Sequence, residues 1–186
     1  MANRVRKAAM AAAMAGGILM PRLCAAADIT PGAGTDPRAH LRPTTPGLAS
    51  LIARATEGSA TFRHIVRTIE ESDTYVYVME GDCGHGVRAC FGGVTMAGAR
   101  RIMRVTVALD EGRRDWDVMG SIGHELRHTI EAIQDPTVRS THAQFFLYQR
   151  IGFQGTSQSR ETSAAMEAGN AVRAEIRKFT HSAKAE

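Results

Sequence analysis

The sequence predicts an α+β domain in which a small, mostly antiparallel sheet lies between helical segments. Apolar residues recur at spacings of three and four early in the chain and again over its last third, which is the helical period. Between these stretches, β-branched and aromatic residues such as those at 74–79 predict strands. Glycine-rich turns separate the expected strands, and short connections favour antiparallel pairing.

The first 27 residues have the features of a signal peptide. A basic start precedes a small, apolar stretch at residues 8–20, and a small-residue cleavage site follows at Ala27. The apolar stretch is too short to span a membrane, so we expect a secreted or periplasmic protein without a stable span. The alternatives are a disordered basic tail, or lipidation at Cys24, whose preceding residues form a poor lipobox.

Removing this segment changes the charge of the chain. The whole sequence has 23 Lys and Arg, 19 Asp and Glu, and a net charge of +4. Four of the basic residues and none of the acidic ones lie in the signal segment, which leaves 19 of each. A formally neutral mature chain argues against nucleic acid as a partner.

The remaining chain divides into a leader and one domain. Residues 28–46 are rich in Pro, Gly and Thr and predict a flexible leader, followed by a domain over residues 47–186. Periodicity predicts helices at residues 48–56, 60–69, 116–133, 141–151 and 160–179, and strands at 74–79, 87–96 and 101–109. Gly92 and Gly93 interrupt the second strand and predict a β-bulge.

Two cysteines remain after signal removal. Cys83 and Cys90 form an even pair separated by six residues, and in an exported protein such a pair favours a disulfide between two strands or across a hairpin. The rival interpretation combines Cys83, His85 and Cys90 in a second metal site, which needs a fourth ligand that the sequence does not reveal.

The segment His124-Glu125-Leu126-Arg127-His128 carries the most specific chemistry in the chain. Two histidines four residues apart on a helix lie on the same face, so both imidazoles can bind a single zinc ion. The surrounding apolar stripe of Met119, Ile122, Leu126, Ile130 and Ile133 lies on the opposite face and points to the core. Glu125 is then placed to act as a general base on a zinc-bound water.

With this motif the chain resembles the zincin metallopeptidases, as a small, secreted, bacterial-type member. The resemblance implies a zincin-like fold, a Zn²⁺ cofactor, a peptide or protein substrate that binds along the edge strand, and hydrolysis of the peptide bond with Glu125 as the base. The alternatives are a surface helix with two unrelated histidines, or a non-catalytic zincin-fold binding module of the periplasm or cell surface.

A catalytic zinc site needs a third protein ligand. The metzincin pattern requires a histidine where this chain has Gln134, so that subtype is excluded. The gluzincin-like pattern takes a glutamate from a later helix, and Glu161, expected in the first turn of the last helix, is the best candidate. His142 is its competitor, and the alternative for Glu161 is a glutamate stabilised by the helix dipole.

Other residues near the motif have expected roles. Tyr148 and His142 are candidates for the donor that stabilises a developing oxyanion, although Tyr148 also fits a core position. Glu131 can accept the second ring N–H of His128, or pair with Arg127 on the surface.

Overall fold

The computed structural model covers all 186 residues and describes residues 36, 38–84, 86–109, 112, 114–154 and 160–183. All of these belong to one compact unit, Pro31–Glu186. The predicted signal peptide, residues 1–27, and most of the predicted leader lie outside the described residues. Among the helices that are described, none is both long and apolar enough to cross a bilayer.

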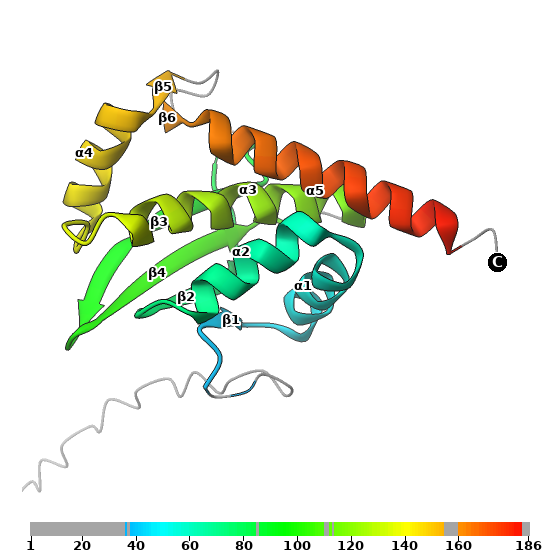
Figure 1. The fold of residues 1–186 in the computed structure, drawn as a ribbon, viewed down its shortest axis with the longest axis horizontal. Helices are drawn as coiled ribbons and strands as arrows, with labels where there is room; N and C mark the ends of the chain where they lie inside the picture. Colours follow the sequence, from blue (N-terminus) through cyan, green and yellow to red (C-terminus); the bar gives the residue numbers. More distant parts are fainter. Residues whose placement is uncertain are drawn as a thin grey trace, which may run out of the picture. The chain divides into compact units, whose positions relative to one another are not determined.

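Helices pack on one face of a four-stranded sheet in the described part of the chain (Figure 1). The elements, in order, are β1 (Leu41–Pro43), α1 (Pro46–Gly58), α2 (Ala60–Glu70), β2 (Thr74–Glu80), β3 (Ala89–Ala97), β4 (Arg100–Val107), α3 (Asp115–Gln134), α4 (Thr141–Ile151), β5 (Phe153–Gln154), β6 (Arg160–Glu161) and α5 (Ser163–Ser182). This arrangement confirms the predicted α+β class.

The sheet is mixed, so the prediction of a mostly antiparallel sheet is wrong. The strand order is β1-β2-β4-β3; β1–β2 and β2–β4 are parallel, and β3–β4 is antiparallel. The chain leaves β2, skips one position to form β3 at the sheet edge, and returns through a hairpin to place β4 between them. β2 and β3 therefore do not pair with each other, although only a short connection joins them, and β4 runs parallel to β2.

The ordered domain begins before the predicted boundary at residue 47. Leu41 pairs with Val76 and Pro43 with Val78, and the side chain of Leu41 is buried in the core. Residues 41–43 are thus an edge strand rather than part of a flexible leader, because alternate residues contribute to the core despite a Pro- and Thr-rich sequence.

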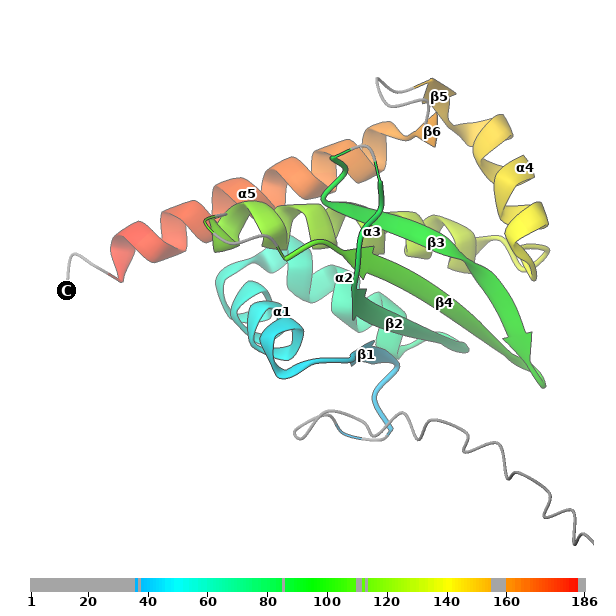
Figure 2. The ribbon, with the colours of Figure 1, turned by 180° about the vertical axis from the view of Figure 1, so that it is seen from behind.

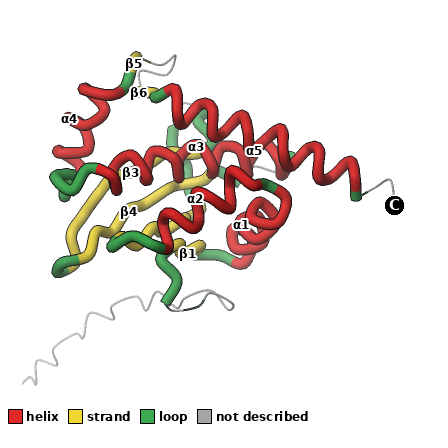
Figure 3. Tube along the Cα trace, viewed as in Figure 1, coloured by secondary structure: helices red, strands yellow, loops and turns green. Residues whose placement is uncertain are grey.

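Helices α1, α2 and α3 cover one face of the sheet, and α5 packs against these helices, most extensively against α3 (Figures 1 and 3). Alternation in the strands produces the core: Val76 and Val78 of β2 and Met103 and Val105 of β4 are fully buried. From the opposite side, Figure 2 shows the other face of the sheet, over which no described helix lies.

The bulge predicted at Gly92-Gly93 is confirmed by a shift in the β3–β4 register between Phe91 and Gly93. Gly93 has a φ of +141°, and a Cβ at this position would lie 2.4 Å from Oγ1 of Thr141. That hydroxyl contacts both the N–H and the carbonyl of Val94 at 3.3 Å. The bulge therefore lets the start of α4 pack against the edge strand.

Candidate metal centre

Helix α3 presents His124 and His128 on one face, as the spacing predicts. The two rings lie with centroids 4.9 Å apart, and the side chain of His128 is almost fully buried. Asp115 and Asp117 occupy the first turn of the helix, where negative charge is favoured by its dipole. The residues of the opposite face, including Ile122 and Leu126, are fully buried and fix the helix on the core.

Glu161 completes a group of three possible ligands with these histidines. Its Oε2 lies 2.9 Å from Nε2 of His124 and 3.7 Å from Nε2 of His128. One ligand atom from each of the three residues lies within 4.8 Å of the others. The structure thus brings Glu161 to the motif, whereas His142 lies on α4 with its ring against Phe146.

The position of Glu161 differs from the prediction in one respect. It lies in the short strand β6, which pairs with β5, and not in the first turn of the last helix. Helix α5 begins at Ser163, and the side chain of Thr162 caps it by accepting a hydrogen bond from the backbone N–H of Ala165. Thr162 favours the cap position, so the helix starts after the ligand.

Close packing of α3 against α5 sets the distance between the histidines and Glu161. A Cβ at Gly169 would lie 3.0 Å from the Cβ of His124 and 3.1 Å from the carbonyl oxygen of Gly120. A Cβ at Gly123 would lie 2.9 Å from a methyl group of Val172. Glycines on both helices therefore allow their backbones to approach directly behind the motif.

The separations of the Glu161 oxygen from the two histidine nitrogens are close to those of a tetrahedral zinc site. Zn–N and Zn–O bonds near 2.1 Å in a tetrahedral arrangement place neighbouring ligand atoms about 3.4 Å apart. The observed separations of 2.9 and 3.7 Å lie on either side of this value. Two imidazoles and a carboxylate leave the fourth position for a water, as in catalytic zinc sites.

Two linked hydrogen bonds orient the ring of His128. Its Nδ1 lies 2.9 Å from Oε2 of Glu131, and Oε1 of Glu131 accepts a bond of 2.6 Å from the hydroxyl of Thr162. Burial would raise the pKa of Glu131, but these two hydrogen bonds outweigh it and lower the pKa. Because Nδ1 donates to Glu131, Nε2 is left to bind a metal. The predicted pairing of Glu131 with His128 is therefore observed.

The carboxylate of Glu125 lies beside this group. Its Oε1 is 3.8 Å from Nε2 of His124, and its side chain is 13% exposed. Burial raises its pKa to about 7, although the nearby histidines and a hydrogen bond with the backbone of Phe91 act in the opposite direction. Glu125, His128 and Glu161 all line one cavity of about 270 Å³, so the carboxylate faces the same space as two of the three possible ligands.

Tyr148 lies at the wall of that cavity, but its hydroxyl is already engaged. It donates a hydrogen bond of 2.7 Å to the backbone carbonyl of His128, and its ring contacts the ring of His128 edge-on. Burial raises the pKa of the phenol above its usual range. The oxyanion role stays a prediction, and this hydrogen bond argues against it because the single hydroxyl proton points to α3.

Cys83 and Cys90 form the predicted disulfide, with a Cα–Cα distance of 5.9 Å. Both residues line the cavity that contains Glu125 and His128, so the bridge fixes one wall of the site. His85 lies outside the described residues. A second metal site with both cysteines as thiolate ligands is not compatible with the bridge.

Comparison of the chain with family models, characterised proteins and solved structures found no match in any of the three. The fold and the site define the protein as an α+β domain with a possible metal centre of two histidines and a glutamate.

Proposed function

We propose that this protein is a zinc-dependent hydrolase, a small exported peptidase of the gluzincin-like zincin type. The observation that supports it best is the convergence of His124, His128 and Glu161 beside the buried carboxylate of Glu125. Export rests on the predicted signal peptide, residues 1–27.

The donor set favours zinc over magnesium and calcium. Two imidazoles and one carboxylate suit Zn²⁺, whereas Mg²⁺ and Ca²⁺ prefer six or more oxygen ligands. The Glu131 carboxylate that holds His128 is typical of the outer shell around a histidine ligand.

When bound, zinc supplies a Lewis acid that polarises a carbonyl and lowers the pKa of water. Glu125 is the group that moves the proton: its carboxylate takes a proton from the attacking water and passes it to the leaving amine. The carboxylate lines the same cavity as His128 and Glu161, and the disulfide and Tyr148 form part of its walls.

The placement of β3 favours a peptide as the substrate. β3 is the last strand of the sheet, and its residues Ala89, Cys90 and Phe91 line the cavity together with Glu125. A strand at a sheet edge can pair with an extended peptide through backbone hydrogen bonds. A peptide bound in this way would lie beside the cavity that Glu125, His128 and Glu161 line.

The substitution Glu125→Gln tests this proposal. We expect hydrolysis of an unfolded protein substrate to fall by at least about 100-fold, because the base is removed, while one zinc per chain remains bound. Glu167→Ala, at an exposed position of α5, is the control and should keep both zinc and activity.

Two results would contradict the proposal. Unchanged hydrolysis in Glu125→Gln would show that Glu125 is not the base. Zinc binding without hydrolysis of any peptide by the wild type would favour the non-catalytic binding module instead.

A further inference from the structure

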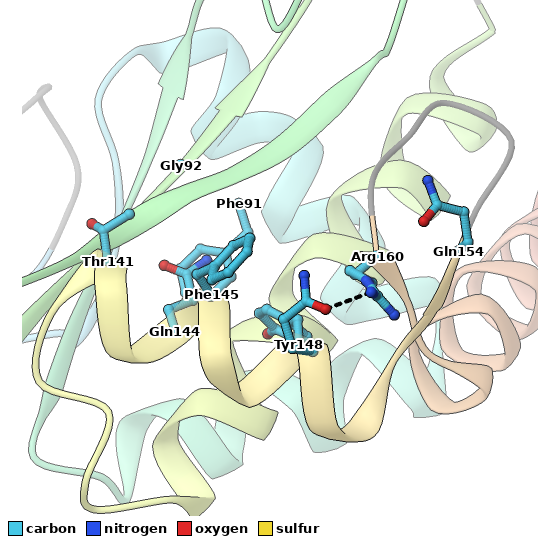
Figure 4. A pocket seen from close by; sticks show the side chains of 9 residues that line it. Phe91, Gly92, Thr141, Gln144, Phe145, Tyr148, Gln154 and Arg160 are labelled. Carbon is cyan, nitrogen blue, oxygen red and sulfur yellow. Dashed lines mark hydrogen bonds between the residues drawn. The ribbon is translucent and has the colours of Figure 1, made fainter.

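A second cavity, of about 370 Å³, adjoins the proposed metal cleft (Figure 4). It lies between α4 and the bulged part of β3. Phe91, Gln144, Tyr148 and Arg160 line both spaces, so the second cavity opens next to the position of the ligands. Any chain bound across the metal cleft would place a neighbouring group at its mouth.

The walls of this cavity are aromatic. Phe91 from β3 and Tyr148 from α4 contact edge-on with ring centroids 6.5 Å apart, and Phe145 stands beside them on α4 (Figure 4). Phe145 is 55% exposed, so part of its ring is free to contact a ligand. Gly92, between the two walls, has no side chain to fill the space.

One buried polar side-chain atom beside this cavity has no hydrogen-bond partner among the described residues. Gln144 is 7% exposed, and the atom is its side-chain oxygen Oε1. Buried polar side-chain atoms are normally paired, and an unpaired one at a site calls for an explanation. Because Gln144 lines both the aromatic cavity and the metal cleft, a bound ligand is the natural source of the missing N–H donor.

Arg160 adds a positive charge where this cavity meets the metal cleft. It donates a hydrogen bond to the side chain of Gln149, as the dashed line in Figure 4 shows. This guanidinium disfavours a basic side chain, and the three aromatic rings favour an aromatic side chain over an acidic one.

We propose that this cavity is a specificity subsite that binds an aromatic side chain of the substrate, with the carbonyl oxygen of Gln144 accepting a hydrogen bond from the substrate backbone. The inference rests on the proposed function for the identity of the ligand as a peptide. It adds the substrate class: peptides with Phe, Tyr or Trp close to the cleaved bond.

The binding test uses metal-free protein, so it does not depend on catalysis. N-acetyl-phenylalaninamide, N-acetyl-alaninamide and N-acetyl-lysinamide are titrated into isotope-labelled full-length chain and followed by NMR. We expect the phenylalanine amide to bind about tenfold or more tightly than the other two. Its addition should shift the resonances of Phe91, Gln144 and Phe145. Equal binding of all three amides, or shifts confined to other residues, would overturn the subsite.

Two adjacent phenylalanines offer a matched pair of variants. Phe145 and Phe146 are each 55% exposed on α4, but the first lines the cavity and the second does not. Phe145→Ala should abolish the preference for the phenylalanine amide, and Phe146→Ala should keep it. Gln144→Leu should weaken binding of that amide about fivefold, because the acceptor is lost while the side-chain volume is kept. The same loss in both phenylalanine variants would contradict the assignment.

Cleavage of a peptide mixture by the zinc-loaded wild type separates the two proposals. Products enriched in an aromatic residue at one fixed position, with the enrichment lost in Phe145→Ala, support both. Hydrolysis without any aromatic preference overturns the subsite alone. Selective binding of the phenylalanine amide without hydrolysis of any peptide supports the subsite as a binding site and overturns the hydrolase.

Discussion

His128 is the most constrained residue of the proposed centre. Its Nδ1 bonds to Glu131, its backbone carbonyl accepts a hydrogen bond from Tyr148, and its ring contacts His124 edge-on. Burial opposes protonation of the ring, but its hydrogen bond with Glu131 and the nearby carboxylate of Glu161 raise its pKa. A metal that binds the ring must displace its proton. We therefore expect the zinc affinity to depend on how firmly the carboxylates of Glu131 and Glu161 hold the ring in place.

The outer-shell role of Glu131 predicts the effect of Glu131→Gln. A neutral amide has one acceptor oxygen, so it cannot accept from both His128 and Thr162 as the carboxylate does. We expect zinc affinity, measured by competition with a chelator, to fall by about 10- to 100-fold. Glu125→Gln is the control, because Glu125 is not a proposed ligand. Equal affinities of Glu131→Gln and the wild type would remove Glu131 from the centre.

At the scale of elements, the contact between α3 and α5 assembles the site. The first helix carries both histidines, and the second begins two residues after Glu161. A Cβ at Gly169 would meet the Cβ of His124, the carbonyl oxygen of Gly120 and the guanidinium of Arg173; only the guanidinium can move away without a shift of a helix. The distance between the helices is therefore sensitive to a single carbon atom.

Gly169→Ala tests this dependence. The added methyl group should force the helices apart and lower the free energy of unfolding by about 1–3 kcal/mol, measured by urea denaturation. Zinc affinity should fall in the same variant, since Glu161 moves with α5. Glu167→Ala, on the exposed side of the same helix, should change neither quantity. A stabilised Gly169→Ala protein with wild-type zinc affinity would refute the close-packing argument.

A second element-scale contact joins the sheet to the end of α3. Arg101 is 6% exposed; its guanidinium donates to the backbone carbonyls of Ala132, Ile133 and Asp135 and pairs with Asp73 at 2.8 Å. These carbonyls lie at the C-terminus of the motif helix, where a positive charge is favoured. Arg101 thus holds the helix at the end beyond His128.

This contact predicts a pH dependence of stability. The hydrogen bond from Arg101 lowers the pKa of Asp73 from its ordinary value of 3.8. The carboxylate therefore stabilises the fold at pH values above 3.8, and the contribution is lost as the pH falls through the lowered pKa. We expect Asp73→Asn to be less stable than the wild type at neutral pH, and the difference to vanish in strong acid. Because Asp73 is 55% exposed, the effect should be small and reduced by salt. A difference that stays constant with pH would contradict the assignment.

At the scale of the whole molecule, local patterns predicted the elements but not their arrangement. The apolar periods identified the helices, and the histidine spacing identified the face of α3 that bears the site. Whether two strands pair in parallel depends on the order in which the chain fills the positions of the sheet. No local sequence pattern indicates that a position is left open between β2 and β3, which β4 then fills. The burial of Arg101 and of Gln144 could not be predicted locally either, because charge and polarity predict exposure.

The third ligand shows the same limit. Glu161 was predicted as a ligand from the resemblance and from its place near the last helix, yet its strand conformation was not. The pairing of β5 with β6 joins only two residues on each side, too few for a periodic signal. The Thr162 cap, which a capping pattern could have identified, marks the start of α5 after the ligand.

The central claim is that His124, His128 and Glu161 hold one zinc ion, and metal stoichiometry of the purified chain tests it most directly. Elemental analysis should find one zinc per chain in the wild type, in His142→Ala and in Glu167→Ala, and a large loss in Glu161→Ala. Zinc absent from the wild type after incubation with the metal, or retained fully in Glu161→Ala, would contradict the account.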